Sequence, residues 1–158
     1  MPFTPFHIGP ALLIYSVFLF LDPFALVIGG LIPDIEPFSR LYLGLGNAVH
    51  GPLHSLVGPI FLLPFTLLFT LLTWKVYARI HPSTKLRRTL WQVSLISALF
   101  GSYSHIFLDA FLYSEMNLAW PLPYWNPFLY QLPSFTIYNI ALACFLIALP
   151  LIIIRRYR

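Results

Sequence analysis

Charge is scarce in this sequence of 158 residues. Charged residues make up 9% of the chain, whereas soluble domains carry about 25%. Apolar residues make up 59% and aromatic residues 18%, and the mean hydropathy is +0.81. This composition excludes a disordered chain, which would be poor in apolar residues, and argues against a water-soluble globular domain. The single cysteine, Cys144, excludes an intrachain disulfide and a cysteine-based zinc finger.

The sequence contains several long apolar runs. Four of them approach or exceed the ~20 residues that a helix needs to cross a bilayer, and they cover residues 6–21, 55–74, 89–113 and 134–154. A fifth run, 25–32, is much shorter. We therefore predict an all-α integral membrane protein with about four transmembrane helices and a short or half-helix over 24–33. A chain of this length normally forms one domain, so we expect a single helical membrane domain over 1–158.

Basic residues fall into two groups that are separated by two predicted crossings. One group precedes the fourth long run and the other follows the last: Lys75, Arg79, Lys85, Arg87 and Arg88, then Arg155, Arg156 and Arg158. Because basic residues in short loops stay in the cytoplasm, we expect the 74–88 loop and the C-terminus to be cytoplasmic in a cell (inner or plasma) membrane. Residues 33–54 and 110–133 then lie toward the opposite face. The first run lacks the basic flank and cleavage site of a signal peptide, so we expect it to stay in the protein.

Histidines and acidic residues gather in or beside the apolar runs, on the predicted non-cytoplasmic side. They are His7, Asp34, Glu36, His50, His54, His105, Asp109 and Glu115. An Asp at the centre of a membrane helix costs ~2.5–3.5 kcal/mol on insertion scales, and mutual hydrogen bonds or a shared cation would offset such costs. Arg40 is the only basic residue in this part of the sequence, so the carboxylates need a cation from elsewhere. Imidazole together with carboxylate suits zinc and similar divalent metals.

The spacing of these residues strengthens the prediction of a metal site. His50 and His54 are four residues apart, as are His105 and Asp109, and residues i and i+4 of a helix project from the same face. Pro52 lies between the two histidines, which fits a helix that begins near His50 because proline is tolerated in a first turn. Either pair alone could be a hydrogen bond between packed helices. Four segments, however, each deliver ligand-type residues to one side of an apolar protein.

Five short motifs follow one another along the chain: TPFH at 4–7, LIPDIE at 31–36, HGPLHS at 50–55, SHIFLD at 104–109 and WPL at 120–122. This ordered set resembles the YdjM-like family of membrane-bound metal-dependent hydrolases, and the resemblance spans residues 4 to about 128. It implies a helical membrane protein with a His/Asp metal site, distantly similar to zinc-dependent phospholipase C and the single-strand nuclease fold. The metal-ligand positions of the family fall on His7, Asp34, His50, His54, His105 and Asp109.

The chain departs from the family pattern in two places. Glu36 stands where the family usually has the second Asp of an Asp-x-Asp segment, and only His50-Gly51 remains of a usual His-Arg-Gly element. The loss of that arginine puts a basic contact to an anionic substrate in doubt. Nothing in the sequence shows whether Arg40 replaces it.

These observations predict a membrane-bound metal-dependent hydrolase that acts on phosphoester or other ester bonds of lipidic or membrane-tethered substrates. The expected cofactor is a divalent metal, Zn²⁺ before others, as one or two ions. Six candidate ligands exceed the three of a typical catalytic zinc, which favours two ions ~4 Å apart that act on the attacking and leaving oxygens. Asp34 is the expected bridging ligand, and Glu36 or Glu115 is the expected general base.

Two other functions stay open at this stage. The same cluster could serve a metal or proton transporter or channel, although the sequence shows no inverted repeat of the kind many transporters have. A metal could also clamp the helices of a structural membrane protein, in which case the coordination would be closed. Membrane lipids are the expected partners and nucleic acid is not expected; the substrate and the oligomeric state stay open.

Overall fold

The computed structural model describes residues 4–44, 48–81 and 91–156, and every regular element within them is helical. In chain order the elements are η1 (Thr4–His7), α1 (Ile8–Val17), α2 (Pro23–Leu31), η2 (Ile32–Asp34), α3 (Ile35–Leu43), η3 (Pro52–His54), α4 (Gly58–Ile80), α5 (Trp91–Asp109) and α6 (Ser134–Arg156), where η marks a 3-10 helix. The predicted all-α class is confirmed.

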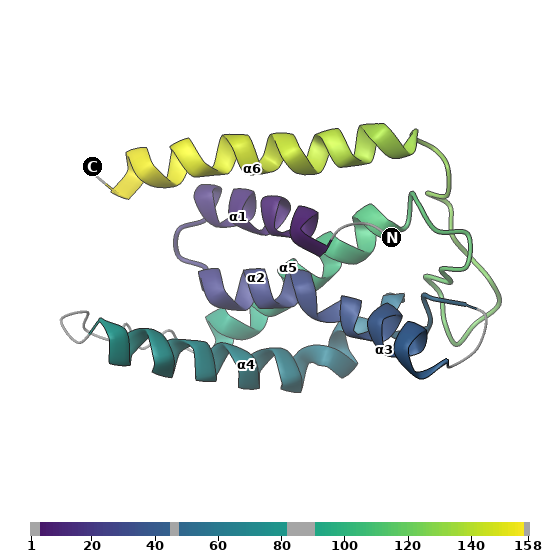
Figure 1. Cartoon of the computed structure of the whole chain (residues 1–158), viewed down its shortest axis with the longest axis horizontal. Coiled ribbons are helices and arrows are strands. Elements are labelled where there is room, and N and C mark those ends of the chain that lie inside the picture. The colour runs from purple at the N-terminus through teal and green to yellow at the C-terminus, as the bar shows by residue number, and fades with distance from the viewer. Residues whose placement is uncertain (1–3, 45–47, 82–90, 157–158) are drawn as a thin grey trace.

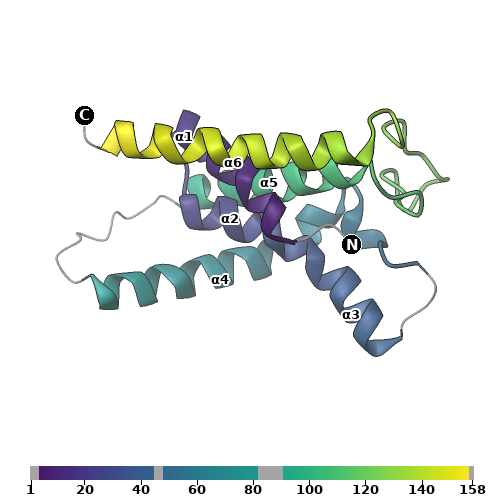
Figure 2. The same ribbon diagram turned by 45° about the horizontal axis from the view of Figure 1, so that its top comes forward.

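The helices run back and forth along one long axis (Figure 1). Helices α4 and α6 lie on opposite sides (Figures 1 and 2), and α1 and α2 lie between them in Figure 1, whereas α1 crosses α6 in Figure 2. Helix α2 packs mainly on α5, and α1 packs mainly on α6. The C-terminal ends of α1, α4 and α6 lie at one end of the molecule, whereas α3 and the long connection between α5 and α6 lie at the other (Figure 1).

Two helices in the described part of the chain are long and apolar enough to cross a membrane, namely α4 and residues Ser134–Arg155 of α6. The expected count of about four spans is therefore not confirmed. Helices α1 and α2 have 10 and 9 residues, so each is only about 15 Å long against a hydrocarbon core of about 30 Å. The short helix expected over 24–33 is present, as α2 continuing into η2.

Asp22 explains why the neighbouring apolar runs 6–21 and 25–32 form two short helices instead of one continuous helix. Its carboxylate accepts hydrogen bonds from the backbone amides of Phe24 and Ala25, as an N-cap should, and Pro23 occupies the first helical position. The same carboxylate accepts from the Trp74 indole at 3.0 Å and from the Ser94 hydroxyl at 2.7 Å. Asp22 is buried, yet its oxygens are supplied with donors from α2, α4 and α5.

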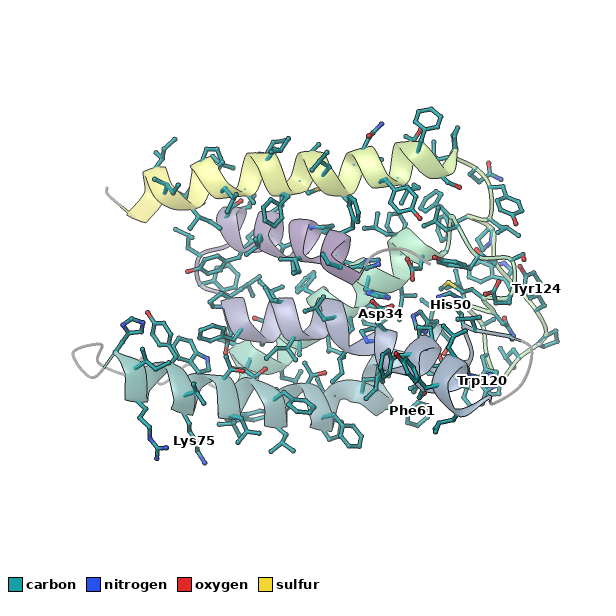
Figure 3. All side chains as sticks on the ribbon, in the orientation of Figure 1. Asp34, His50, Phe61, Lys75, Trp120 and Tyr124 are labelled. Atoms are coloured by element: carbon teal, nitrogen blue, oxygen red, sulfur yellow. The ribbon has the colours of Figure 1, made fainter. Side chains whose placement is uncertain are left out.

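The basic ends of the two spans lie at the same end of the fold as Asp22. Lys75 lies toward the far end of α4 (Figure 3), and Arg155 of α6 donates to the Ser16 and Val17 carbonyls at the end of α1. Four residues of the predicted basic groups lie outside the described residues: Lys85, Arg87, Arg88 and Arg158. The cytoplasmic location of this end stays a prediction.

Glycines set the close approach of α2 and α5. A Cβ atom on Gly101 would overlap the Leu26 carbonyl oxygen, and one on Gly29 would overlap the carbonyl oxygen of Ala98. The two backbones are therefore in direct contact, as at small-residue helix contacts in membranes. This contact fixes the position of the C-terminal end of α5 relative to the C-terminal end of α2 along the helix axes.

We expect Gly101→Val to lower the stability of the protein by about 1–3 kcal/mol, because the added side chain meets backbone that cannot swing away. Thermal unfolding in detergent, followed by circular dichroism, measures the change. Ala143→Val is the matched control, since it adds volume on the exposed side of α6. Equal midpoints for Gly101→Val and the wild type would contradict the proposed contact.

Candidate metal centre

The six predicted metal ligands lie together at the end of the molecule where α4 and α6 begin. They come from the end of η1, from η2, from the segment before η3, from η3 itself and from the last turns of α5. Figure 3 shows Asp34 and His50 in this region, between the Lys75 end of α4 and the long connection that carries Trp120 and Tyr124. Four of the six have ligand atoms that all lie within 4.8 Å of one another: Asp34, His54, His105 and Asp109.

Asp109 lies at the middle of the cluster. One carboxylate oxygen lies 3.4 Å from Nε2 of His7 and the other lies 3.3 Å from Nε2 of His105. The Nε2 atoms of His50 and His54 lie 3.9 and 4.0 Å from that second oxygen. Asp109 therefore faces four imidazoles.

Asp34 lies at the edge of the same cluster. Its carboxylate lies 3.6 Å from Nε2 of His105 and is partly exposed, whereas Asp109 is fully buried. The expected role of Asp34 as the carboxylate that bridges two ions stays a prediction. Among the contacts of the cluster, Asp109 has the central position, because the end of α5 is surrounded by the other ligand-bearing segments.

In three of the histidines the outer nitrogen, which is the Nδ1 atom on the side away from the cluster, lies within hydrogen-bond distance of an oxygen atom. Nδ1 of His105 donates to the Gly30 carbonyl at 2.8 Å, and because a carbonyl can only accept, the proton is on Nδ1. Nδ1 of His54 lies 3.0 Å from Glu36, and Nδ1 of His50 lies 3.0 Å from Glu115. In each ring the Nε2 atom faces the cluster. Metal-binding histidines show this arrangement, in which an outer oxygen fixes the tautomer and the ring orientation.

Eight buried side-chain atoms have no hydrogen-bond partner within residues 4–44, 48–81 and 91–156, and all eight belong to the six predicted ligands. They are both ring nitrogens of His7, the Nε2 atoms of His50, His54 and His105, one oxygen of Asp34 and both oxygens of Asp109. Each such atom costs about 1–3 kcal/mol when it stays unpaired, so eight would consume a typical folding free energy of about 5–15 kcal/mol. A cation at the centre would remove this cost. Four imidazoles and two carboxylates fit zinc or a similar divalent ion.

The two spaced pairs reach the cluster in different ways. His105 and Asp109 lie one turn apart on α5, as the i, i+4 spacing predicts. The prediction that an α-helix begins near His50 is wrong. Residues Pro52–His54 form a single 3-10 turn, and α4 begins only at Gly58. A Cβ atom on Gly58 would overlap the Leu53 carbonyl oxygen, so the chain folds back tightly here. The rings of His50 and His54 still meet, with centroids 4.6 Å apart.

Glu36 and Glu115 lie behind the histidines. Burial alone would raise the pKa of the Glu36 carboxyl, but the hydrogen bond with His54 and the backbone of Gly51 and Leu53 outweigh it and hold the pKa below its ordinary value. Partial burial would also raise the pKa of the Glu115 carboxyl, but the hydrogen bond with His50 outweighs it, and the net result is a lowered pKa. Both groups are therefore carboxylates at neutral pH. The general-base role expected of one of them stays a prediction.

Three further contacts were not foreseen from the sequence. The Gly30 carbonyl holds His105, and a backbone oxygen leaves no signal in a sequence. The Tyr113 ring packs on His50 with centroids 3.9 Å apart. Arg40 lies 3.5 Å from Glu36 and donates to the Ala48 carbonyl, a contact that the i, i+4 spacing of Glu36 and Arg40 could have suggested.

We expect Glu36→Gln to weaken metal binding by about 10–100-fold, because the amide supports the His54 ring less well than the carboxylate does. Competition with a chromophoric chelator measures the affinity of the purified protein. Glu115→Gln is the comparison, and we expect a smaller loss because Glu115 is partly exposed and holds His50, which lies outside the four-residue group. Unchanged affinity in both variants would show that the two carboxylates do not act on the ligands.

The chain matches the YdjM inner membrane protein family over residues 7–158. No curated protein and no solved structure matches it significantly. The matched range includes all six candidate ligands and both helices of membrane-spanning length, so the family match and the apolar helices support a membrane location. Because the match covers nearly the whole sequence, the chain belongs to the YdjM inner membrane protein family.

Proposed function

We propose that this chain is a membrane-embedded metal-dependent hydrolase that acts on phosphoester or other ester bonds of lipidic or membrane-tethered substrates. The observation that carries the proposal is the set of eight buried, unpaired ligand atoms on six residues within the described part of the chain. A bound cation would pair these buried atoms, and the donor set suits a divalent metal.

Two groups of ligands are available for metal ions. Asp34, His54, His105 and Asp109 would hold the first ion, since their ligand atoms lie close enough together to share one. His7 lies near the other oxygen of Asp109, and His7 and His50, the two ligands outside this group, would serve a second ion, with Asp109 shared between the two. A bound divalent ion lowers the pKa of its water to about 7 and polarises a phosphoryl or carbonyl oxygen. Zinc is the metal we favour.

The remaining residues of the site keep the ligands in place. Glu36, Glu115 and the Gly30 carbonyl each take the outer nitrogen of one histidine, so the inner nitrogens stay aimed at the cluster. Arg40 lies on the far side of Glu36 and is one-quarter exposed. Its guanidinium has donors beyond those used by Glu36 and Ala48, so among the described residues it is the nearest cation for an anionic substrate.

The position of the cluster favours chemistry at the membrane surface over conduction. His54 lies four residues before the start of α4, and the other ligands lie at the same end of the fold. An ion pathway would place its ligands near the midplane with access from both sides. A site at one end of the spans instead suits the polar part of a lipid or of a membrane-tethered molecule.

We expect purified wild-type protein to contain at least one equivalent of a divalent metal, and we expect His105→Ala and Asp109→Ala to lose it. Both substitutions remove a central ligand. Elemental analysis after gel filtration measures the content, and His81→Ala, at the other end of α4, is the control that should retain it. Wild-type metal content in both His105→Ala and Asp109→Ala would show that the cluster is not the metal site.

We expect the metal-loaded protein to hydrolyse a phospholipid in mixed micelles and to lose this activity when a chelator removes the metal. Release of water-soluble phosphate ester and of fatty acid, followed separately, shows which bond is cut. Restored turnover on adding Zn²⁺ to the chelated wild type, but not to Asp109→Ala, would tie the reaction to the site. A protein that keeps its metal but hydrolyses neither kind of bond would instead be one in which the metal only clamps the helices.

A further inference from the structure

Helix α3 carries exposed apolar side chains along one side. Four large apolar residues there are 50–76% exposed, namely Ile35, Phe38, Leu41 and Tyr42. The rings of Phe38 and Tyr42 pack on each other, with centroids 4.4 Å apart. The opposite side of the helix carries Glu36 and Pro37, which are buried. The outer face of α3 is therefore apolar and its inner face holds a charge, which is the reverse of a surface helix in a water-soluble protein.

The other elements at this end of the molecule mark the boundary of the membrane. Both helices of membrane-spanning length begin here, and α3 runs obliquely to them (Figure 2). Phe61 and Phe135, in the first turns of α4 and α6, are 55% and 66% exposed, so the lipid-facing surface of both spans begins at this level. The connection between α5 and α6 adds exposed aromatic side chains with polar tips, which are favoured where a membrane meets water: Trp120, Tyr124, Trp125 and Tyr130.

Lipid fits the outer face of α3 better than a second protein does. At their exposures the four side chains present roughly 500 Å² of surface, given about 150–250 Å² for a whole aromatic side chain. Each partner in a stable protein–protein interface buries about 800 Å². A bilayer needs no such matching area, and an amphipathic helix in its boundary buries its apolar side about 5–10 Å deep.

The inner face of α3 holds the segment that carries His50 and His54. The carboxylate of Glu36 lies 3.0 Å from Nδ1 of His54 and contacts the backbone of Gly51. One turn farther along α3, Arg40 donates to a backbone carbonyl oxygen at the start of the same segment. A Cβ atom on Gly51 would overlap both the Arg40 guanidinium and the Glu36 carboxylate, so the segment lies directly against α3. Two predicted metal ligands thus depend on the position of this helix.

We propose that α3 lies in the boundary between headgroups and acyl chains, with its apolar face in the lipid, and that this contact holds residues 48–54 at the cluster. The inference rests on the membrane location and goes beyond the hydrolase proposal. Arg40 is one-quarter exposed and lies between the two faces of α3, so in this position its guanidinium is at the level of the lipid phosphate groups.

Spin labels on α3 test its contact with lipid. Cys144→Ser removes the only cysteine, so Phe38→Cys and Tyr42→Cys can each carry one nitroxide in vesicles of phosphatidylethanolamine and phosphatidylglycerol. Power saturation compares collisions with oxygen, which concentrates in lipid, and with a water-soluble nickel complex. We expect oxygen collisions to dominate and the labels to lie about 5–10 Å below the boundary.

Two further sites calibrate the spin-label measurement. Ser114→Cys, exposed on the connection at the same end, is the reference for water, and Phe69→Cys, half exposed in the middle of α4, is the reference for lipid. Nickel collisions on α3 as frequent as at Ser114 would overturn the proposal. Labels on α3 that neither reagent reaches would show a protein partner or a second copy on this face, and would overturn it too.

Hydrogen exchange in the same vesicles tests whether lipid contact holds the ligand segment. We expect Phe38→Gln combined with Tyr42→Gln to speed exchange of the backbone amides in residues 48–54 about tenfold, which corresponds to ~1.4 kcal/mol. Glutamine keeps the helix and removes the apolar contact without adding a charge. Ser114→Gln is the matched control and should leave the exchange unchanged. A chelator in every sample makes the result independent of metal binding.

Protection of α4 and α5 in the same spectra shows whether the double variant is folded, and the single variant Phe38→Gln is measured in parallel. Unchanged exchange of residues 48–54 in a folded variant would overturn the proposed hold on the segment. Because neither measurement requires a metal or turnover, a failure of the hydrolase proposal would leave both results interpretable.

Discussion

The structure depends on the meeting of one buried carboxylate with four imidazoles. The Nε2 atoms of His7, His50, His54 and His105 all lie within 4.0 Å of Asp109. Nδ1 of His105 donates to the Gly30 carbonyl, so its Nε2 atom faces the carboxylate. A divalent cation at this point would pair with the carboxylate and with the inner nitrogens, and its binding would then be coupled to folding.

The packing that places Asp109 is the contact between α2 and α5. Gly29 and Gly101 let the two backbones touch, and His105 lies one turn beyond Gly101. The same approach brings the Gly30 carbonyl to 2.8 Å from the ring of His105. The glycines thus serve the site as well as the fold, because a wider spacing of these helices would leave His105 without the oxygen that fixes its tautomer.

The sequence predicts the identity of the candidate ligands better than it predicts their arrangement in space. Residue type and the apolar surroundings predict the cluster, and helical spacing predicts the His105–Asp109 pair. The expected count of four spans is not confirmed, because the apolar run 6–21 forms a helix of only 10 residues and Asp22 and Pro23 begin another helix directly after it. The central place of Asp109 depends on which segments surround the end of α5, and this is a property of tertiary packing. Local spacing along the chain carries no information about it.

A second buried carboxylate in the same molecule shows that the unpaired state of Asp109 is not a general property of this fold. Asp22 is as deeply buried, yet two backbone amides, an indole and a hydroxyl donate to it. The chain can therefore supply donors to a buried acid where the acid only joins helices. Around Asp109 the neighbours are histidines, whose outer nitrogens are engaged by other oxygens in three of four cases. The Nε2 atoms of these histidines therefore face Asp109, an arrangement that suits a metal ligand better than an acid that only joins helices.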